Sequence, residues 1–283
     1  MNPTFFGIDP KWNSLIPLVA INVLMLLTVV IFALFFYKKK PGDPDLVGRH
    51  TSKMVGPFLR EYWAWFISPF EKLFVALGIS PNTLTTFGFL LSLVSAWAFA
   101  TGHMGIAGWF MIIGGTFDMF DGRIARRTGK TSTAGAFYDA VMDRFGEAVV
   151  FLGLAYYYRD SWVLFLVLAA LVGSLMVSYT KARGDSEGVD CKGGIMQRPE
   201  RIVYLGVGSI FSPPFRQIVN PQAAEPVEYL TIAALAVIGS MTLLTAVYRM
   251  YYIFRKLKIR DGHKPKEPSM PLFRKFTHRY LDS

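Results

Sequence analysis

Four aspartates in the middle of the chain combine a residue type and a spacing that suit chemistry. Asp118 and Asp121 lie three residues apart, and Asp139 and Asp143 lie four apart. Each spacing places both carboxylates on one face of a helix, so two helices could direct all four at one point. Oxygen ligands without a nearby histidine or cysteine suit Mg²⁺, Mn²⁺ or Ca²⁺ rather than zinc or copper. Four carboxylates carry enough negative charge for two divalent ions.

The residues between these two acidic pairs suit a diphosphate. Gly122 and Ala125 leave room for a ligand close to the backbone, and Arg126 offers a planar fork of donors that fits phosphate oxygens. Divalent ions beside a diphosphate neutralise the charge that builds on a leaving phosphate. The segment therefore predicts a metal-dependent phosphoryl-transfer site.

The elements that would position this site are membrane helices. The chain has 283 residues, of which 52% are hydrophobic, a composition typical of a polytopic membrane protein. Apolar stretches long enough to cross about 30 Å of hydrocarbon predict spans at 15–37, 80–101, 105–126, 133–157, 161–180, 202–219 and 229–248. The span at 202–219 is the weakest, since Ser212, Pro213 and Pro214 interrupt it, and alone it could be re-entrant. Residues 47–77 mix basic and aromatic side chains, a pattern that predicts an amphipathic helix on the membrane surface.

The distribution of positive charge predicts an orientation for these spans. With the N-terminus outside, 26 of the 30 lysines and arginines fall on the cytoplasmic side, as the positive-inside rule requires. The formal net charge of +10 is then explained by topology, which removes most of the support for nucleic-acid binding. The same orientation places the four aspartates near the cytoplasmic face of a membrane that we take to be the bacterial inner membrane.

The pattern of the acidic segment is also that of a known family. It reads D-x-x-D-G-x-x-A-R-x8-G-x-x-x-D-x-x-x-D, with Gly135 as its second glycine, and it resembles the CDP-alcohol phosphotransferase signature at every fixed position. The resemblance covers about 78–252. It implies an all-α bundle with a six-span core, to which this chain adds an N-terminal transmembrane helix and the amphipathic helix. The corresponding division is 1–46 for the first helix and linker, 47–77 for the amphipathic helix, 78–252 for the catalytic membrane domain and 253–283 for a basic cytoplasmic tail.

The resemblance implies an activity, a metal requirement and residue roles. Family members move a phosphatidyl or similar group from a CDP-linked donor to an alcohol and release CMP. Asp118, Asp121 and Asp139 would bind two Mg²⁺ or Mn²⁺ ions, with Asp143 at the metals and also the base for the acceptor hydroxyl. The residues implied to contact the nucleotide diphosphate are Gly122, Ala125, Arg126, Pro81, Asn82 and Thr85. The family also implies a homodimer.

The acceptor is suggested by basic residues on both sides of a cytoplasmic loop. Lys181 and Arg183 precede the loop and Arg198 and Arg201 follow it, an arrangement suited to an acceptor that carries a phosphate. It is similar to that of the family's bacterial phosphatidylinositol phosphate synthases, which implies CDP-diacylglycerol as donor and inositol phosphate as acceptor. Glu200 could instead pair with Arg198 or Arg201 and make that corner structural.

Other functions remain as alternatives. The same family could use glycerol-3-phosphate, serine or free inositol as the acceptor. A cation channel or transporter could use the acidic cluster as its ion site, although it would not need Gly122, Ala125 and Arg126. A di-iron bundle usually needs histidines beside the carboxylates, and none of the four histidines is in register.

Overall fold

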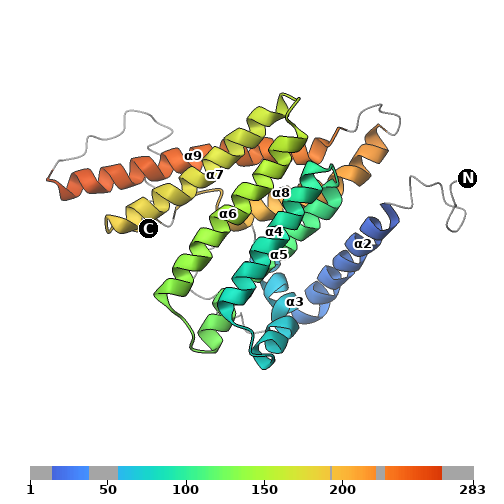
Figure 1. The fold of residues 1–283 in the computed structure, drawn as a ribbon, viewed down its shortest axis with the longest axis horizontal. Coiled ribbons are helices and arrows are strands. Elements are labelled where there is room, and N and C mark those ends of the chain that lie inside the picture. The colour runs from blue at the N-terminus through green and yellow to red at the C-terminus, as the bar shows by residue number, and fades with distance from the viewer. Residues whose placement is uncertain (1–14, 38–56, 192, 221–226, 263–283) are drawn as a thin grey trace, which may run out of the picture.

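The computed structural model describes residues 15–37, 57–191, 193–220 and 227–262, and the regular elements within them are helices (Figure 1). In chain order these are α2 (Leu15–Ile31), the π-helical η2 (Phe32–Phe36), α3 (Pro57–Ala76), α4 (Pro81–Ala100), α5 (Met104–Arg127), α6 (Thr133–Tyr157), α7 (Val163–Ser186), α8 (Arg198–Val219) and α9 (Tyr229–Arg260). The expected all-α class is confirmed.

Helices α4 to α9 form one bundle. Helix α5 packs between α4 and α8, and α9 packs along α7 and α8. Close approach depends on glycines: a β-carbon on Gly108 of α5 would lie 2.5 Å from the carbonyl oxygen of Gly206 on α8. Such contacts suit helices in a membrane, where small residues let backbones meet. The main core lies among α4 to α9 and includes Phe99, Phe151 and Leu235.

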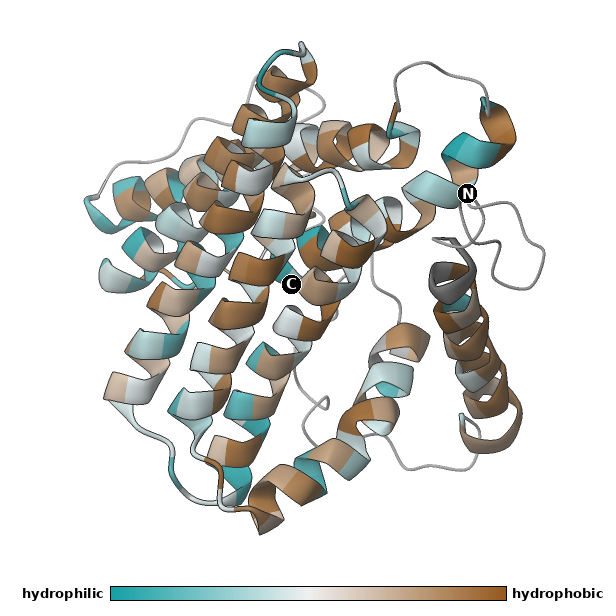
Figure 2. Ribbon diagram, turned by 45° about the vertical axis from the view of Figure 1, so that its right-hand side comes forward, coloured by the Kyte–Doolittle hydropathy of each residue, from teal (hydrophilic) through white to brown (hydrophobic). Residues whose placement is uncertain are grey.

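Helices α2 and α3 lie outside this bundle. Phe32 of η2, which continues α2, packs against Tyr62 and Trp65 of α3. Thr28 of α2 and Tyr62 also share a hydrogen bond of 2.8 Å between their hydroxyl oxygens. The helix predicted within 47–77 begins at Pro57 and packs on the last turns of α5. Hydrophobic residues dominate the outer surface of α2 (Figure 2).

Four described helical segments are long and apolar enough to cross a membrane, namely α2 together with η2, α4, α7 and α9. Helices α5, α6 and α8 have 24, 25 and 22 residues, enough to span the hydrocarbon layer at about 1.5 Å per residue, but they carry the charged residues of the acidic segment and its partners. The chain is thus an integral membrane protein. The number of its spans stays a prediction.

Three helices differ from the expected spans. Helix α7 continues to Ser186, so Lys181 and Arg183 lie on a helix and not in a loop. Helix α8 begins at Arg198, four residues before the expected span, and is continuous through Pro213 and Pro214 to Val219. Helix α9 runs on to Arg260, past the domain boundary drawn at 252. The lysines at 38–40, the linker 41–46 and the tail beyond 262 lie outside the described residues.

Candidate active site

Helices α5 and α6 bring three of the four aspartates together. Asp118 and Asp121 lie in the last turns of α5, and Asp139 lies in the second turn of α6. One carboxylate oxygen from each lies within 4.8 Å of the others. Two ligands of one Mg²⁺ or Ca²⁺ ion lie at most about 4 to 5 Å apart, so the three oxygens fit a divalent cation without rearrangement of the backbone.

The surroundings of these carboxylates favour a cation. Thr85 of α4 donates a 2.6 Å hydrogen bond to Oδ2 of Asp121, which fixes the orientation of that carboxylate. Oδ1 of Asp139 is buried and has no hydrogen-bond partner within the described chain. Leaving a buried carboxylate oxygen without a partner is costly, and a metal ion would satisfy it.

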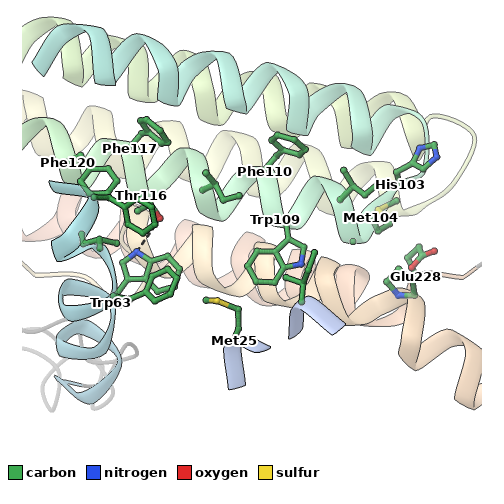
Figure 3. A pocket seen from close by; sticks show the side chains of 18 of the residues that line it. Met25, Trp63, His103, Met104, Trp109, Phe110, Thr116, Phe117, Phe120 and Glu228 are labelled. Carbon is green, nitrogen blue, oxygen red and sulfur yellow. Dashed lines mark hydrogen bonds between the residues drawn. The ribbon is translucent and has the colours of Figure 1, made fainter. Parts of the chain in front are cut away.

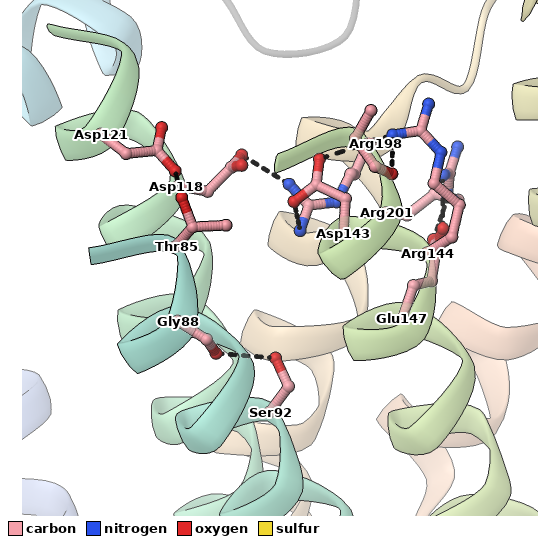
Figure 4. Close-up of polar contacts among 11 residues, drawn as sticks. Thr85, Gly88, Ser92, Asp118, Asp121, Asp143, Arg144, Glu147, Arg198 and Arg201 are labelled. Atoms are coloured by element: carbon pink, nitrogen blue, oxygen red, sulfur yellow. Dashed lines mark hydrogen bonds and ion pairs between the residues drawn. The ribbon is translucent and has the colours of Figure 1, made fainter. Parts of the chain in front are cut away.

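Asp143 joins the cluster through Arg198. The Arg198 guanidinium lies between two helices: Nη1 is 2.5 Å from Oδ2 of Asp118, and Nη2 is 2.7 Å from Oδ1 of Asp143. Figure 4 shows this bridge and the Thr85 contact on the other side of Asp118. Asp143 is therefore close to the three-carboxylate group but not one of its members. Its Oδ2 is turned toward Arg144, whose Nη1 is 3.8 Å away.

The position of Arg198 is set by the segment before it. Oγ1 of Thr245 on α9 accepts hydrogen bonds of 3.3 Å from the backbone N–H groups of Ile195 and Met196. The guanidinium of Arg249, also on α9, donates to the Gly193 carbonyl at 2.9 Å. The polar groups of α9 thus hold the chain that leads into α8 and place Arg198 over the carboxylates.

The start of α8 has its own cap. Gln197 and Glu200 form a reciprocal capping box. Glu200 therefore bonds to the backbone, and the alternative in which it pairs with Arg198 or Arg201 is not formed. Cys191 lies in the same segment, and burial raises the pKa of its thiol, which disfavours the reactive thiolate form.

The predicted diphosphate residues lie on the last turns of α5 and the first turns of α4 and α6. A β-carbon on Gly122 would lie 3.3 Å from Nη1 of Arg126, so Arg126 extends over the glycine. A β-carbon on Gly135 would lie 3.4 Å from Oδ1 of Asn82, which shows that Gly135 brings the starts of α4 and α6 together. Ala125 is half-buried. Pro81 begins α4, and the side chain of Ser80 caps the helix.

The four predicted acceptor cations do not converge. Arg201 is 1% exposed and binds Glu147 through Nε at 2.5 Å and Nη2 at 2.8 Å. Arg183 is 64% exposed and pairs with Glu187 on its own helix, and Lys181 is exposed nearby. Of the four, Arg198 is the one in direct contact with the aspartates. Position along the chain does not determine which of these side chains lie together, because that depends on rotation around α7 and α8; their roles at the acceptor stay a prediction.

Two buried acids near the site were missed by the sequence interpretation. Glu147 follows Asp143 by four residues and so shares its helix face, a signal that was available. Glu71 of α3 is buried and binds both Arg123 and Arg127 of α5, at 3.0 and 2.8 Å. No local pattern could reveal a pairing across more than 50 residues.

Comparison with known proteins agrees with this geometry. The sequence profile of the CDP-alcohol phosphatidyltransferases matches residues 78–219. The phosphatidylinositol phosphate synthase of Mycobacteroides abscessus is 32% identical over 208 residues, which cover 71% of this chain and 89% of the relative. The chain belongs to the CDP-alcohol phosphatidyltransferase family. It is therefore a membrane-bound transferase.

Solved structures of a family member show the same fold. The phosphatidylinositol phosphate synthase of Mycobacterium tuberculosis with CDP-DAG bound superposes with a TM-score of 0.58 at 26% identity, covering 68% of this chain and 94% of that one. The structure of that enzyme in complex with manganese and citrate gives the same TM-score and covers 66% and 88% of the two chains. The match to the family profile begins at residue 78, so helices α2 and α3 of this chain lie before the matched part.

Proposed function

We propose that this enzyme transfers the phosphatidyl group of CDP-diacylglycerol to inositol phosphate and releases CMP. The observation that carries the proposal is the convergence of Asp118, Asp121 and Asp139 with the Arg198 guanidinium at their edge. Carboxylates of this kind hold divalent ions, and an arginine beside them suits a second phosphate. The names of the relatives and the CDP-DAG in the related structure support the same donor and acceptor.

The metal-binding residues in this proposal are Asp118, Asp121 and Asp139, with Asp143 beside them. Mg²⁺ or Mn²⁺ bound there would neutralise the negative charge of the diphosphate. The manganese in the related structure supports this choice. Thr85 acts through Asp121, because its hydroxyl holds one carboxylate oxygen and leaves the other for the ion.

The donor would lie with its diphosphate over the last turns of α5. Gly122 and Ala125 leave the backbone accessible there, and Arg126 supplies a cation for phosphate oxygens. Pro81 and Asn82 at the start of α4 lie beside this surface, since Gly135 of α6 brings Asn82 close. The acyl chains would stay in the lipid.

Arg198 is the main candidate for the acceptor's phosphate. The buried Arg201, through its pair with Glu147, would help to hold Arg198 in position. Lys181 and Arg183, at the exposed end of α7, would act at longer range by attracting an anion.

The transfer itself needs a base. Oδ2 of Asp143 is the oxygen that Arg198 does not hold, and it would take the proton of the acceptor hydroxyl. The acceptor oxygen then forms a bond to the β-phosphorus of the donor, and the bond from that phosphorus to the bridging oxygen breaks. CMP leaves with the electron pair on its phosphate, stabilised by Arg126.

The same proposal includes a location and an assembly. The enzyme would lie in the bacterial inner membrane with its active site toward the cytoplasm, its N-terminus outside and a basic cytoplasmic tail at 253–283. A six-span catalytic domain at 78–252 would form a homodimer. The excess of lysine and arginine on one side supports the orientation.

The deciding measurement is CMP release by the purified protein with CDP-diacylglycerol, Mg²⁺ or Mn²⁺ and a panel of acceptors. We expect inositol phosphate to support the fastest release, with glycerol-3-phosphate, serine and inositol at least about tenfold slower. Asp143→Asn should abolish release while CDP-diacylglycerol binding survives. If glycerol-3-phosphate were the best acceptor, the acceptor assignment would be wrong. Full turnover of Asp143→Asn would remove that residue from the role of base.

A further inference from the structure

A large apolar groove lies between the N-terminal helices and the bundle, away from the proposed active site. Its volume is about 960 Å³, and its walls come from α2, α3, α5 and the end of α8. Its lining includes Ile21 and Met25 of α2 and Trp109 and Ile113 of α5. Figure 3 shows Trp63 and Glu228 toward opposite ends of the groove, with Trp109 between them.

The groove is separated from the carboxylates by the body of α5. Trp109 precedes Asp118 by nine residues, or two and a half turns at about 3.6 residues per turn, so the two side chains leave opposite faces of the helix. A headgroup at the Trp109 end would therefore lie about 14 Å along α5 from Asp118 and on the opposite face of the helix. That end of the groove is distinct from the aspartate site, although the other end passes Phe117 and Phe120.

The groove is long enough to hold the acyl chains of a lipid. It extends along α5 from His103 to Phe120, about 26 Å at 1.5 Å per residue, which exceeds the roughly 15 Å that one leaflet contributes to a bilayer's hydrocarbon layer. At the end near Phe120, Trp63 donates a 3.2 Å hydrogen bond to Thr116, so its indole N–H is satisfied. The apolar walls at that end suit acyl chains.

The end near His103 carries polar groups with unused capacity. Glu228 is 1% exposed; its Oε1 accepts a hydrogen bond from Arg216, but its Oε2 has no partner within the described residues. The buried Nε1 of Trp109 also lacks an acceptor there. Both residues line the groove, as does Arg216. Burying such groups without partners is costly, so their arrangement indicates a polar ligand.

We infer that this groove binds a phospholipid of the leaflet far from the aspartates, with a zwitterionic phosphoethanolamine headgroup. Arg216 takes the phosphate, Oε2 of Glu228 accepts hydrogen bonds from the ammonium, and the Trp109 N–H donates to an ester or phosphate oxygen. The acyl chains run along α5 toward Phe120. We choose this headgroup because of charge complementarity. Arg216 and Glu228 lie side by side, as do the phosphate and the ammonium of phosphoethanolamine that they would bind.

The test uses the full-length protein, stripped of lipid in detergent, with phosphatidylethanolamine or phosphatidylglycerol of identical chains added before native mass spectrometry. The wild type should hold one phosphatidylethanolamine per chain about tenfold more tightly than phosphatidylglycerol. Ile113→Trp, which fills the groove, should weaken that binding about tenfold. Leu168→Trp on α7 is the matched control, since both residues are 41% exposed and Leu168 lies outside the groove. It should change binding less than twofold.

Glu228→Gln keeps the shape of the side chain and should remove the preference for phosphatidylethanolamine. If this variant does not fold, the Ile113 and Leu168 pair still decides the question. Equal binding by Ile113→Trp and the wild type would refute the site, and equal binding of the two lipids by the wild type would refute the headgroup. Displacement of the lipid by CDP-diacylglycerol, with slower CMP release by Ile113→Trp, would show that the donor occupies the groove. If neither the wild type nor any variant released CMP, the proposed function would be contradicted, whereas the lipid site would still be judged by the binding measurements.

Discussion

The two faces of α5 make different kinds of contact with the neighbouring helices. On the aspartate face, polar contacts between helices fix side chains to within hydrogen-bond distance, as between Arg198 and Asp118. On the groove face, apolar side chains of α2 and α3 line a space that protein atoms do not fill. The first face has one arrangement and the second can adapt to its occupant. Substitutions should therefore cause abrupt losses on the aspartate face and graded ones on the groove face.

The largest effect is expected at Asp139. Asp139→Asn keeps the size of the side chain but removes a charge from the three-carboxylate group, which weakens the binding of any divalent ion. CMP release should fall at least about 10³-fold, equivalent to about 4 kcal/mol in transition-state stabilisation. The measurement is CMP release across a Mn²⁺ titration, and chelation of the metal by EDTA should reproduce the loss in the wild type.

The matched control is Asp160→Asn, an exposed acid at the other end of the bundle. It should leave CMP release within twofold. An Asp139→Asn enzyme that responded to Mn²⁺ as the wild type does would contradict the assignment of this residue to the metal group.

The next effect is on stability, through the buried pair of Arg201 and Glu147. Arg201→Met leaves the Glu147 carboxylate buried without its counter-ion, which should cost about 3 kcal/mol of unfolding free energy. Replacing both residues by methionine should recover most of this loss, because no charge is then left unpaired. Denaturant unfolding in detergent measures both variants. A double variant as unstable as the single one would show that the pair itself stabilises the fold.

These two cases show what the sequence could reveal. Asp118 and Asp121 share one helix face, and so do Asp139 and Asp143, whichever way each helix is turned in the bundle. The carboxylate face could therefore be predicted from their spacing. Arg198 and Arg201 are three residues apart on α8 and so about 60° apart around it. That rotation places one over the aspartates and buries the other against Glu147, and it depends on how α8 packs on α5 and α9.

The N-terminal region was harder to predict for the same reason. Composition indicated that α2 crosses a membrane and that α3 is amphipathic, and both are helices. The contact of Glu71 with Arg123 joins residues 52 positions apart. The groove is present because α2 lies apart from α5. Neither follows from periodicity, which describes one helix at a time.

A third effect separates Arg198 from Arg183, two arginines of the predicted acceptor set. Arg198→Lys loses the fork that contacts two aspartates at once, and the KM for inositol phosphate should rise about 100-fold while that for CDP-diacylglycerol changes less than threefold. Arg183→Lys is the control, because its pair with Glu187 is exposed to solvent and should shift either KM less than twofold. Steady-state kinetics with each substrate varied gives both values. Equal shifts for the two variants would mean that Arg198 has no special place at the acceptor.

The smallest effect tests how firmly the aspartate face is held. Thr85→Val removes the hydrogen bond to Asp121 but keeps the volume of the side chain, and loss of such a ligand-orienting contact typically weakens metal binding at least tenfold. We expect the Mn²⁺ concentration for half-maximal CMP release to rise about tenfold while the rate at saturating Mn²⁺ stays within threefold. Thr86→Val removes a neighbouring hydrogen bond, to Tyr138, and should leave the Mn²⁺ dependence unchanged. If both threonine variants needed the same additional Mn²⁺, the contact to Asp121 would not be orienting a ligand, and this face would adapt as freely as the groove does.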